Sequence, residues 1–308
     1  MRDYQKIGFI GAGNMAEAMI GAILRTGVRQ PKDIMISDVN TGRRNEITGK
    51  FNVDAAASNS EVAEACGIII LAVKPQVMDE MLRELSGEGC FEGMSRRRLF
   101  ISIAAGIRLS RLEKIIYAGR TEEEKAAMPV IRVMPNTPAL VGAGVSGVCA
   151  NTHTVEKDIE QATELLSSMG EVFVFDEDKM DAVTAVSGSG PAYGFYLLEA
   201  MTEAGHKLGL TRAEALKLAQ GAVSGALALI RHEMEDPEIL RSKVTSPGGT
   251  TEAAISRLEN NHVKDLVVEA VLAAAKRSRE LSSSEDAYSS CFPDISPPCP
   301  FRESLLPG

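Results

Sequence analysis

The feature that most constrains the fold is a glycine-rich turn close to the N-terminus. A short apolar run, Ile7–Ile10, leads into the segment Gly11–Ala16, after which apolar residues recur at helical spacing. A strand, a glycine turn and a helix N-terminus in this order form the dinucleotide-binding fingerprint. Gly11 permits a tight turn, Gly13 lets a pyrophosphate approach the backbone, and the free N–H groups of the helix face its charge. Such turns also occur for structural reasons alone, so this one favours nucleotide binding without specifying it.

Strand and helix signals alternate through the first half of the chain. The most apolar run, Ile68–Val73, is nearly continuous, as expected of a central parallel strand buried on both faces. Further strands are predicted at 34–37, 52–54, 99–103, 130–134, 145–149 and 172–175, and helices at about 42–51, 61–65 and 155–169. This alternation predicts an α/β fold with a doubly wound parallel sheet.

The second half is predicted to be all-α, because no strand signal follows Asp178. Helices are expected at Pro191–Leu208, from the capping box at Thr211 to about Met234, and at Val263–Leu281. We therefore expect a dinucleotide-binding domain at 1–177 and a helical domain at 178–282. Residues 283–308, rich in Ser and Pro, are predicted to be a disordered tail. The segments 87–98 and 117–128 are predicted surface insertions, and the basic triplet 96–98 a solvated loop.

Composition excludes several classes of partner. The chain has 308 residues and a net charge of −9, which argues against nucleic acid or an anionic membrane surface. No run is expected to reach membrane-spanning length, and no apolar signal region is seen at the N-terminus. The five cysteines lack metal-ligand spacing, so no metal site and a reducing, cytoplasmic location are expected (Cys66, Cys90, Cys149, Cys291 and Cys299).

Two kinds of segment are candidates for a ligand site. The first is the set of strand ends, Ala72–Gln76, Ile103–Gly106 and Met134–Pro138, since ligands bind at the carboxyl ends of parallel strands. The second is a pair of Gly-rich segments, Ser187–Tyr193 and Thr245–Thr251, each predicted to be a turn that opens a helix. Their N–H groups and hydroxyls suit a carboxylate, although ordinary helix capping uses the same residues.

No Ser/His/Asp or paired-carboxylate arrangement stands out in the sequence. Hydride transfer beside the predicted dinucleotide would therefore depend on positioning and hydrogen bonding. An acceptor that is already electrophilic, such as an imine, suits a site of this kind.

Taken together, five segments resemble the pyrroline-5-carboxylate reductase family in content and order: Gly8–Met15, Ala72–Pro75, Met134–Pro138, Ser187–Tyr193 and Thr245–Thr251. The resemblance spans residues 6 to about 282, and its last two motifs are the most specific. It implies a Rossmann-type sheet followed by an all-α dimerisation domain. It also implies NADPH- or NADH-dependent reduction of 1-pyrroline-5-carboxylate to L-proline, the last step of proline biosynthesis. The implied assembly is a homodimer with interleaved helical domains, often built further into a decamer.

The resemblance also assigns site residues. The cofactor residues are Gly11, Ala12, Gly13, Asn14 and Met15 at the pyrophosphate, Asp38 and Asn40 at the adenosine ribose, Asn59 near adenine, and Val73, Lys74 and Ala105 towards the nicotinamide. The substrate residues are Glu177, Ser246, Gly248, Gly249, Thr250 and Thr251. Thr251 is the implied catalytic residue, donating a hydrogen bond to the ring nitrogen while the glycine-loop N–H groups take the carboxylate.

The sequence departs from the family pattern at the two long loops, at the tail and at Asp38. An acidic residue after the second strand favours NADH, because it accepts from the ribose 2′-OH and repels a 2′-phosphate. Arg43 and Arg44 could instead pair with that phosphate, or be solvated charges of a first helical turn. The cofactor preference stays open at this point.

Two other functions are compatible with parts of the sequence pattern. A β-hydroxyacid dehydrogenase shares the domain order but usually needs a placed Lys, which neither Gly-rich segment supplies. A nucleotide-sensing protein without catalysis would need no cradle for a carboxylate.

Overall fold

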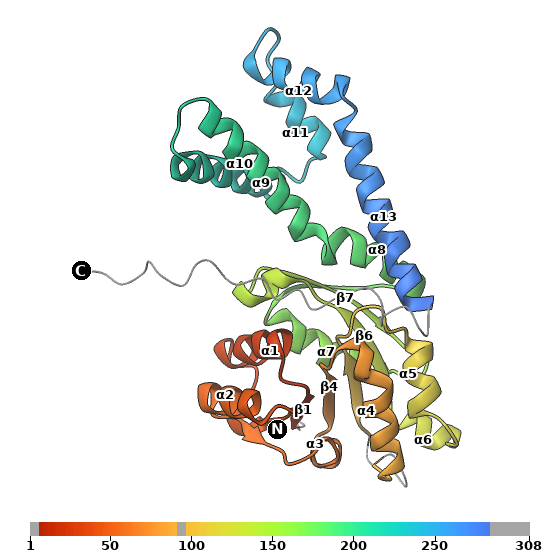
Figure 1. Cartoon of the computed structure of the whole chain (residues 1–308). Helices are drawn as coiled ribbons and strands as arrows, with labels where there is room; N and C mark the ends of the chain where they lie inside the picture. Colours follow the sequence, from red (N-terminus) through yellow and green to blue (C-terminus); the bar gives the residue numbers. More distant parts are fainter. Residues whose placement is uncertain (1–5, 91–96, 284–308) are drawn as a thin grey trace, which may run out of the picture.

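An eight-stranded sheet forms the centre of the N-terminal half of this computed structural model, which describes residues 6–90 and 97–283 (Figure 1). The strands are β1 (Ile7–Ile10), β2 (Ile34–Ser37), β3 (Asp54–Ala55), β4 (Ile68–Leu71), β5 (Leu99–Ser102), β6 (Val130–Met134), β7 (Gly144–Ala150) and β8 (Gly170–Val174). Their order is β3-β2-β1-β4-β5-β6-β7-β8. The first six are parallel, as the alternating pattern predicts.

The last two strands run in the opposite direction to the other six. β7 pairs antiparallel with β6, with Met134 opposite Gly147, and β8 is parallel to β7. The connection from β6 to β7 spans only residues 135–143, too few for the helical crossover that a parallel neighbour needs. The expectation of a doubly wound parallel sheet is confirmed for the body of the sheet and corrected at this edge.

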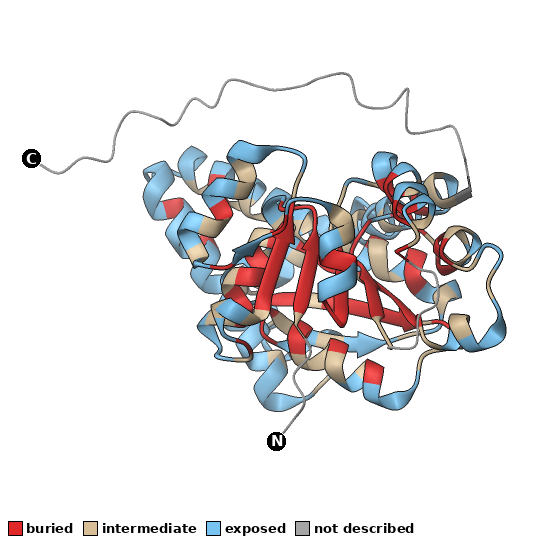
Figure 2. Ribbon diagram, turned by 90° about the horizontal axis from the view of Figure 1, so that it is seen from below, coloured by how far each residue is buried: buried red, intermediate tan, exposed pale blue. Residues whose placement is uncertain are grey.

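Helices cover both faces of the sheet. One face carries α1 (Asn14–Arg25), α2 (Thr41–Phe51) and α7 (Glu156–Ser167), and the other carries α3 (Asn59–Ala65), α4 (Pro75–Gly87), α5 (Leu109–Ile116) and α6 (Glu122–Ala126). On β4, Ile68 and Ile70 pack towards the first face, whereas Ile69 and Leu71 pack towards the second. This double burial explains the continuous apolar run, and Figure 2 shows the strands buried between exposed helix faces.

The C-terminal half is helical throughout its described residues and projects away from the sheet (Figure 1). Its helices are α8 (Met180–Val183), α9 (Gly190–Lys207), α10 (Arg212–Glu233), α11 (Pro237–Lys243), α12 (Thr250–Asn260) and α13 (Val263–Ser283). The capping box predicted at Thr211 is present, and α13 begins at the predicted residue. α9 and α10 approach closely, because a Cβ on Gly205 would lie 2.7 Å from that of Ala215.

α13 returns to the base of the helical half. The Ser278 hydroxyl donates to the Asp181 carboxylate on α8 at 2.6 Å, and both residues are buried. Arg108, in the loop between β5 and α5, contacts the other oxygen of Asp181 at 3.4 Å. One carboxylate therefore connects the first and last helices of this half to the sheet domain.

Three local expectations are wrong. The short strand predicted at 52–54 begins at Asp54, since Asn52 ends α2 in the left-handed conformation with φ 55°. Ser187–Gly188 belongs to a five-residue π-helix (Thr184–Gly188) that continues α8 into α9, not to a turn. In the basic triplet, Arg97 is only partly solvated, with its side chain 35% exposed, because it pairs with the buried Asp158 and donates to the His153 carbonyl at 2.9 Å. Arg96 lies outside the described residues.

One helix, α10, is long and apolar enough to cross a membrane by length and composition, contrary to expectation, among the residues that the structure describes. Its Ala215 and Ala219 are buried, while Leu216, Leu218 and Leu227 are exposed. α10 therefore contacts α9 on one face and leaves leucines exposed elsewhere. The predicted tail at 283–308 lies, beyond Ser283, outside the described residues.

Candidate active site

The glycine turn after β1 is shaped by contact with the neighbouring strand. Gly11 has φ +96°, and a Cβ there would lie 2.8 Å from the Ala72 carbonyl carbon and oxygen. A side chain on Gly13 would meet nothing within 4 Å, so the space in front of it is open. Gly13 is also the N-cap of α1, with no side-chain cap. The first N–H groups of α1 and this open space fit the pyrophosphate of a dinucleotide.

The predicted cofactor residues lie at one edge of the sheet because they follow the carboxyl ends of parallel strands. Backbone bonds join these ends: the Gly11 N–H donates to the Ser37 carbonyl at 2.9 Å, and the Ala72 N–H to the Ile10 carbonyl at 2.8 Å. Val73 and Lys74 lie between β4 and α4, where Lys74 is the N-cap, and the exposed Ala105 follows β5. The structure thus brings the strand-end residues of the predicted site together.

A hollow of about 260 Å³ opens beside the glycine turn, lined by Gly11, Asp38, Val39, Asn59, Val73, Val77, Glu80, Met81 and Glu84. Asp38 accepts from the Ala12 N–H through Oδ2 and from the Asn40 N–H through Oδ1, both at 2.8 Å. Asn59 accepts from the Ser37 hydroxyl at 2.8 Å. Asp38 and Asn59, which the resemblance places at the ribose and near adenine, therefore share one cavity, whereas Asn40 is not among its lining residues.

Sequence reasoning missed the contribution of α4 to this hollow. Val77, Glu80, Met81 and Glu84 follow the i, i+3, i+4, i+7 spacing of one helix face. That spacing is visible in the sequence. What it could not reveal is that this face borders the predicted ribose site.

The two arginines after β2 are held away from the hollow. Arg43 donates from Nε to the Ala12 carbonyl at 2.7 Å and forms ion pairs with Glu17 and Glu46. Arg44 donates to the Ala56 carbonyl at 3.3 Å. The sequence left two possibilities for these arginines, pairing with a 2′-phosphate or solvation in a first helical turn, and neither describes these contacts.

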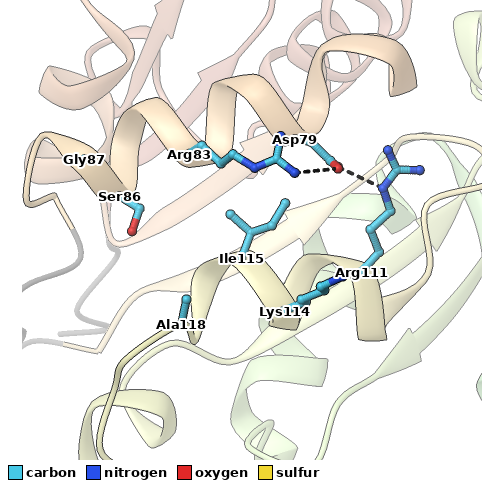
Figure 3. A pocket seen from close by; sticks show the side chains of 8 residues that line it. All are labelled: Asp79, Arg83, Ser86, Gly87, Arg111, Lys114, Ile115 and Ala118. Atoms are coloured by element: carbon cyan, nitrogen blue, oxygen red, sulfur yellow. Dashed lines mark hydrogen bonds and ion pairs between the residues drawn. The ribbon is translucent and has the colours of Figure 1, made fainter. Parts of the chain in front are cut away.

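A second hollow, of about 380 Å³, lies on a different face of α4, between it and α5 (Figure 3). Asp79 pairs with Arg111 of α5 at 2.8 Å and with Arg83 of its own helix at 3.5 Å. None of its lining residues is among those predicted for cofactor or substrate.

The Met134–Pro138 motif contacts the π-helix. The buried Asn136 donates to the Ser187 carbonyl at 3.1 Å and accepts from the Val145 N–H at 2.9 Å. The N–H groups of the Ser187–Tyr193 segment are partly used inside the helix, since the Ser189 N–H donates to the Thr184 carbonyl. This segment is therefore not the open carboxylate cradle that was expected.

The Thr245–Thr251 segment does form a turn that opens a helix. Gly248 has φ +71°, Gly249 is the N-cap of α12 without a side-chain cap, and Thr250 and Thr251 begin the helix. The Gly248 N–H donates to the Glu252 carboxylate at 2.7 Å. A helix N-terminus that already binds a carboxylate of its own chain suits an anionic group.

Within one chain, this turn and the dinucleotide edge are not brought together. Figure 1 shows α12 at the far end of the helical half from β1 and β4. Ser246, Gly248, Gly249, Thr250 and Thr251 therefore lie away from Lys74 and Ala105 of the same chain.

Glu177 lies with the sheet domain instead. Its Oε1 accepts from the Leu109 N–H at the start of α5 at 2.6 Å. The same oxygen pairs with Arg132, a buried residue of β6, at 3.2 Å, while Nη2 of Arg132 has no partner in the described residues. Glu177 thus compensates a buried cation.

Comparison with known proteins gives two family matches. Residues 177–281 match the model described as pyrroline-5-carboxylate reductase dimerisation, and residues 6–106 match NADP oxidoreductase, coenzyme F420-dependent. The pyrroline-5-carboxylate reductase of Pseudomonas aeruginosa is 42% identical over 278 residues, covering 90% of this chain and 97% of that protein.

Solved structures are similar over the same length. A pyrroline-5-carboxylate reductase from Coxiella burnetii superposes with a TM-score of 0.82 at 33% identity, covering 92% of this chain and all of the other. The Plasmodium falciparum pyrroline carboxylate reductase with NADP bound gives 0.78 at 29% identity, covering 91% of this chain and 98% of the other.

Proposed function

Because this chain belongs to the pyrroline-5-carboxylate reductase family, we infer that it reduces 1-pyrroline-5-carboxylate to L-proline with NADPH or NADH, the last step of proline biosynthesis. The observation that carries this function is the 42% identity that extends over 97% of a curated reductase. The reaction adds a hydride to the imine carbon and a proton to the ring nitrogen. When bound, the reduced dinucleotide supplies that hydride.

Residues at the sheet edge hold the dinucleotide in this proposal. Gly11, Ala12 and Gly13 form the turn against which the pyrophosphate lies, and Asn14 and Met15 present the first N–H groups of α1 to it. The N–H groups of Gly11 and Ala12 shape this turn by donating to Ser37 and Asp38. Asp38 and Asn59 bind the adenosine half in the 260 Å³ hollow, and Asn40, the N-cap of α2, binds the ribose beside it. Val73, Lys74 and Ala105 lead towards the nicotinamide, where the short side chain of the exposed Ala105 leaves room for a flat ring.

The α12 turn binds the substrate in the same proposal. The N–H groups of Gly248 and Gly249, together with Ser246 and Thr250, take the carboxylate at the positive end of the helix. The Thr251 hydroxyl donates to the ring nitrogen and so increases the electrophilicity of the imine carbon. When the substrate carboxylate arrives, Glu252 has to release the Gly248 N–H and the Ser246 carbonyl has to release the Gly249 N–H.

Each active site then takes parts from two chains. The α12 turn is remote from its own dinucleotide edge, while α9, α10 and α13 expose many apolar side chains (Phe195, Tyr196, Leu197, Leu218, Leu227, Leu266, Val267, Val268 and Leu272). Pairing two copies through these faces buries them and carries the turn of one chain to the sheet of its partner. This dimer is the minimal catalytic unit, and further association gives a decamer.

Glu177 acts on the substrate side by fixing the first segment of the helical half. Both of its contacts, with Leu109 and Arg132, use Oε1. We place the domain boundary at this residue, with 1–177 binding the dinucleotide and 178–282 forming the dimer. A reducing cytoplasm suits the buried thiol groups of Cys66, Cys90 and Cys149, none of which forms a disulfide bond within the described residues.

Turnover tests the function directly. Purified protein mixed with 1-pyrroline-5-carboxylate should oxidise NADH or NADPH, followed by loss of absorbance, and should yield proline. A 3-hydroxy acid with the oxidised cofactors serves as the control substrate. Absence of imine reduction with both cofactors would contradict the proposal.

A further inference from the structure

We infer that the dinucleotide site of this chain selects NADH over NADPH, and that Asp38, Glu80 and Glu84 make this selection. The inference rests on the proposed function of the same site and goes beyond it by naming the dinucleotide. The two cofactors differ by one phosphate on the 2′-oxygen of the adenosine ribose, a group with nearly two negative charges at neutral pH. The charge around that oxygen therefore decides between them.

Asp38 is held in place at the end of β2. Its two carboxylate oxygens accept from the Ala12 and Asn40 N–H groups, both at 2.8 Å. A carboxylate has about four acceptor positions, so Asp38 can still accept from ribose hydroxyls. It cannot turn away from a 2′-phosphate without losing both backbone bonds, one of which holds Ala12 in the turn beside the pyrophosphate.

Two further carboxylates face the same hollow from α4. Glu80 and Glu84 are one helical turn apart and line the 260 Å³ cavity with Asp38. No Lys or Arg is among the described residues that line it. A phosphate dianion placed here meets three like charges, whereas the neutral hydroxyls of NADH meet hydrogen-bond acceptors.

The cations nearest in sequence are committed to other partners. Arg43 binds the Ala12 carbonyl, Glu17 and Glu46, which engages all three of its nitrogens. Glu17 also pairs with Lys50 at 2.7 Å, and these contacts lower the pKa of Glu17, so the cluster stays charged at neutral pH. Arg43 would have to leave two carboxylates and the carbonyl of the glycine turn to reach a 2′-phosphate.

Binding without turnover tests the inference. Calorimetric titration of the full chain with NADH and with NADPH, in the absence of imine substrate, is expected to give at least about tenfold tighter binding of NADH, a difference of about 1.4 kcal/mol. Asp38→Ser and the double change Glu80→Gln with Glu84→Gln should each reduce this ratio, mainly by tightening NADPH. Glu122→Gln, on exposed α6, removes the same charge elsewhere and should leave the ratio unchanged.

The double glutamine variant keeps the inference testable if Asp38→Ser disturbs the glycine turn. Arg43→Ala tests whether Arg43 contacts the 2′-phosphate. A selective loss of NADPH affinity in this variant would show that it does and would overturn the inference. Equal or tighter binding of NADPH by the unchanged protein would also overturn it, while leaving imine reduction intact. NADH selection without imine turnover would support it and contradict the proposed function. Failure to bind either dinucleotide would overturn both.

Discussion

Gly11 and Gly13 lie two residues apart in one turn and are constrained for different reasons. Gly11→Ala puts a Cβ 2.8 Å from the Ala72 backbone at φ +96°, so the free energy of unfolding should fall by about 1–3 kcal/mol. Gly13→Ala meets no neighbour and should leave stability unchanged, yet its methyl group occupies the pyrophosphate space. Denaturant unfolding and NADH titration of both variants check this. A large loss of stability for Gly13→Ala would contradict it.

Thr251 is expected to act on turnover and not on the cofactor. Thr251→Ala removes the donor to the ring nitrogen and should lower kcat roughly 10- to 100-fold, with unchanged affinity for NADH. Thr251→Ser keeps the hydroxyl and should retain most of the activity. Steady-state kinetics and titration of the two variants separate the effects. Equal kcat in the alanine variant would remove Thr251 from the mechanism.

Single residues were predictable where a motif fixes the backbone, and not where partners are distant in sequence. The glycine turn, Asp38 and the strand ends follow from local pattern alone. The contacts of the Arg43 side chain depend on Glu17, which lies 26 residues earlier and on another helix. The contacts of Glu177 depended likewise on a buried arginine of β6.

Among the elements, the end of α5 is tied to the sheet by one side chain. The Tyr117 hydroxyl donates to the Met128 carbonyl at 2.6 Å and accepts from Asn151 at 2.7 Å. Burial raises the pKa of Tyr117 to about 12. The folded protein therefore keeps this proton above pH 10, where an unfolded tyrosine releases it, so stability falls between pH 10 and 12.

Tyr117→Phe should reveal this dependence. The variant loses both hydrogen bonds and should be less stable than the unchanged protein from about pH 7 to 9, by a constant amount. The gap should narrow as pH rises from about 10 to 12, because phenylalanine has no proton to lose. Unfolding curves at several pH values measure it. A gap that stays constant to pH 12 would contradict the assignment.

Element types were predictable from periodicity, but connections were less so. The long helices at α10 and α13 followed from caps and spacing, whereas Ser187–Gly-Ser-Gly190 looked like a turn because glycine and serine favour turns. In the structure, packing decides otherwise: Asn136 binds the Ser187 carbonyl, and a Cβ on Gly188 would lie 2.6 Å from the Met134 side chain. Small residues there permit close approach to β6, a reason that local propensity does not contain.

For the molecule as a whole, an active site shared between chains predicts complementation. Gly13→Asp blocks the dinucleotide edge, and Thr251→Ala disables the α12 turn, so each variant alone should have little activity. When the two are co-expressed, half of the randomly paired dimers are mixed, and each mixed dimer has one intact site of two. Activity should recover to about one quarter of the unchanged protein.

The same experiment has a built-in control. In this control, a double variant that carries both changes in one chain is co-expressed with the unchanged chain. If each site were built within one chain, every mixed dimer would keep one site without either change. Under the shared arrangement, each mixed site contains one lesion, so activity should fall to the quarter contributed by unchanged dimers. Failure of the single variants to complement would contradict the shared site. Light scattering of the same samples reports whether dimers associate into decamers.

The π-helix between α8 and α9 has a consequence for helical phase. Successive residues of an α-helix are rotated by about 100° about its axis. A π-helical turn contains one residue more than an α-helical turn, and this extra residue therefore sets the direction in which each residue of α9 faces. A single deletion within Thr184–Gly188 that restored α-helical winding would rotate the exposed Phe195 and Tyr196 by that angle relative to α8. One inserted residue thus sets the direction in which the exposed apolar side chains of α9 face, and with it the orientation of the surface proposed to contact the second chain.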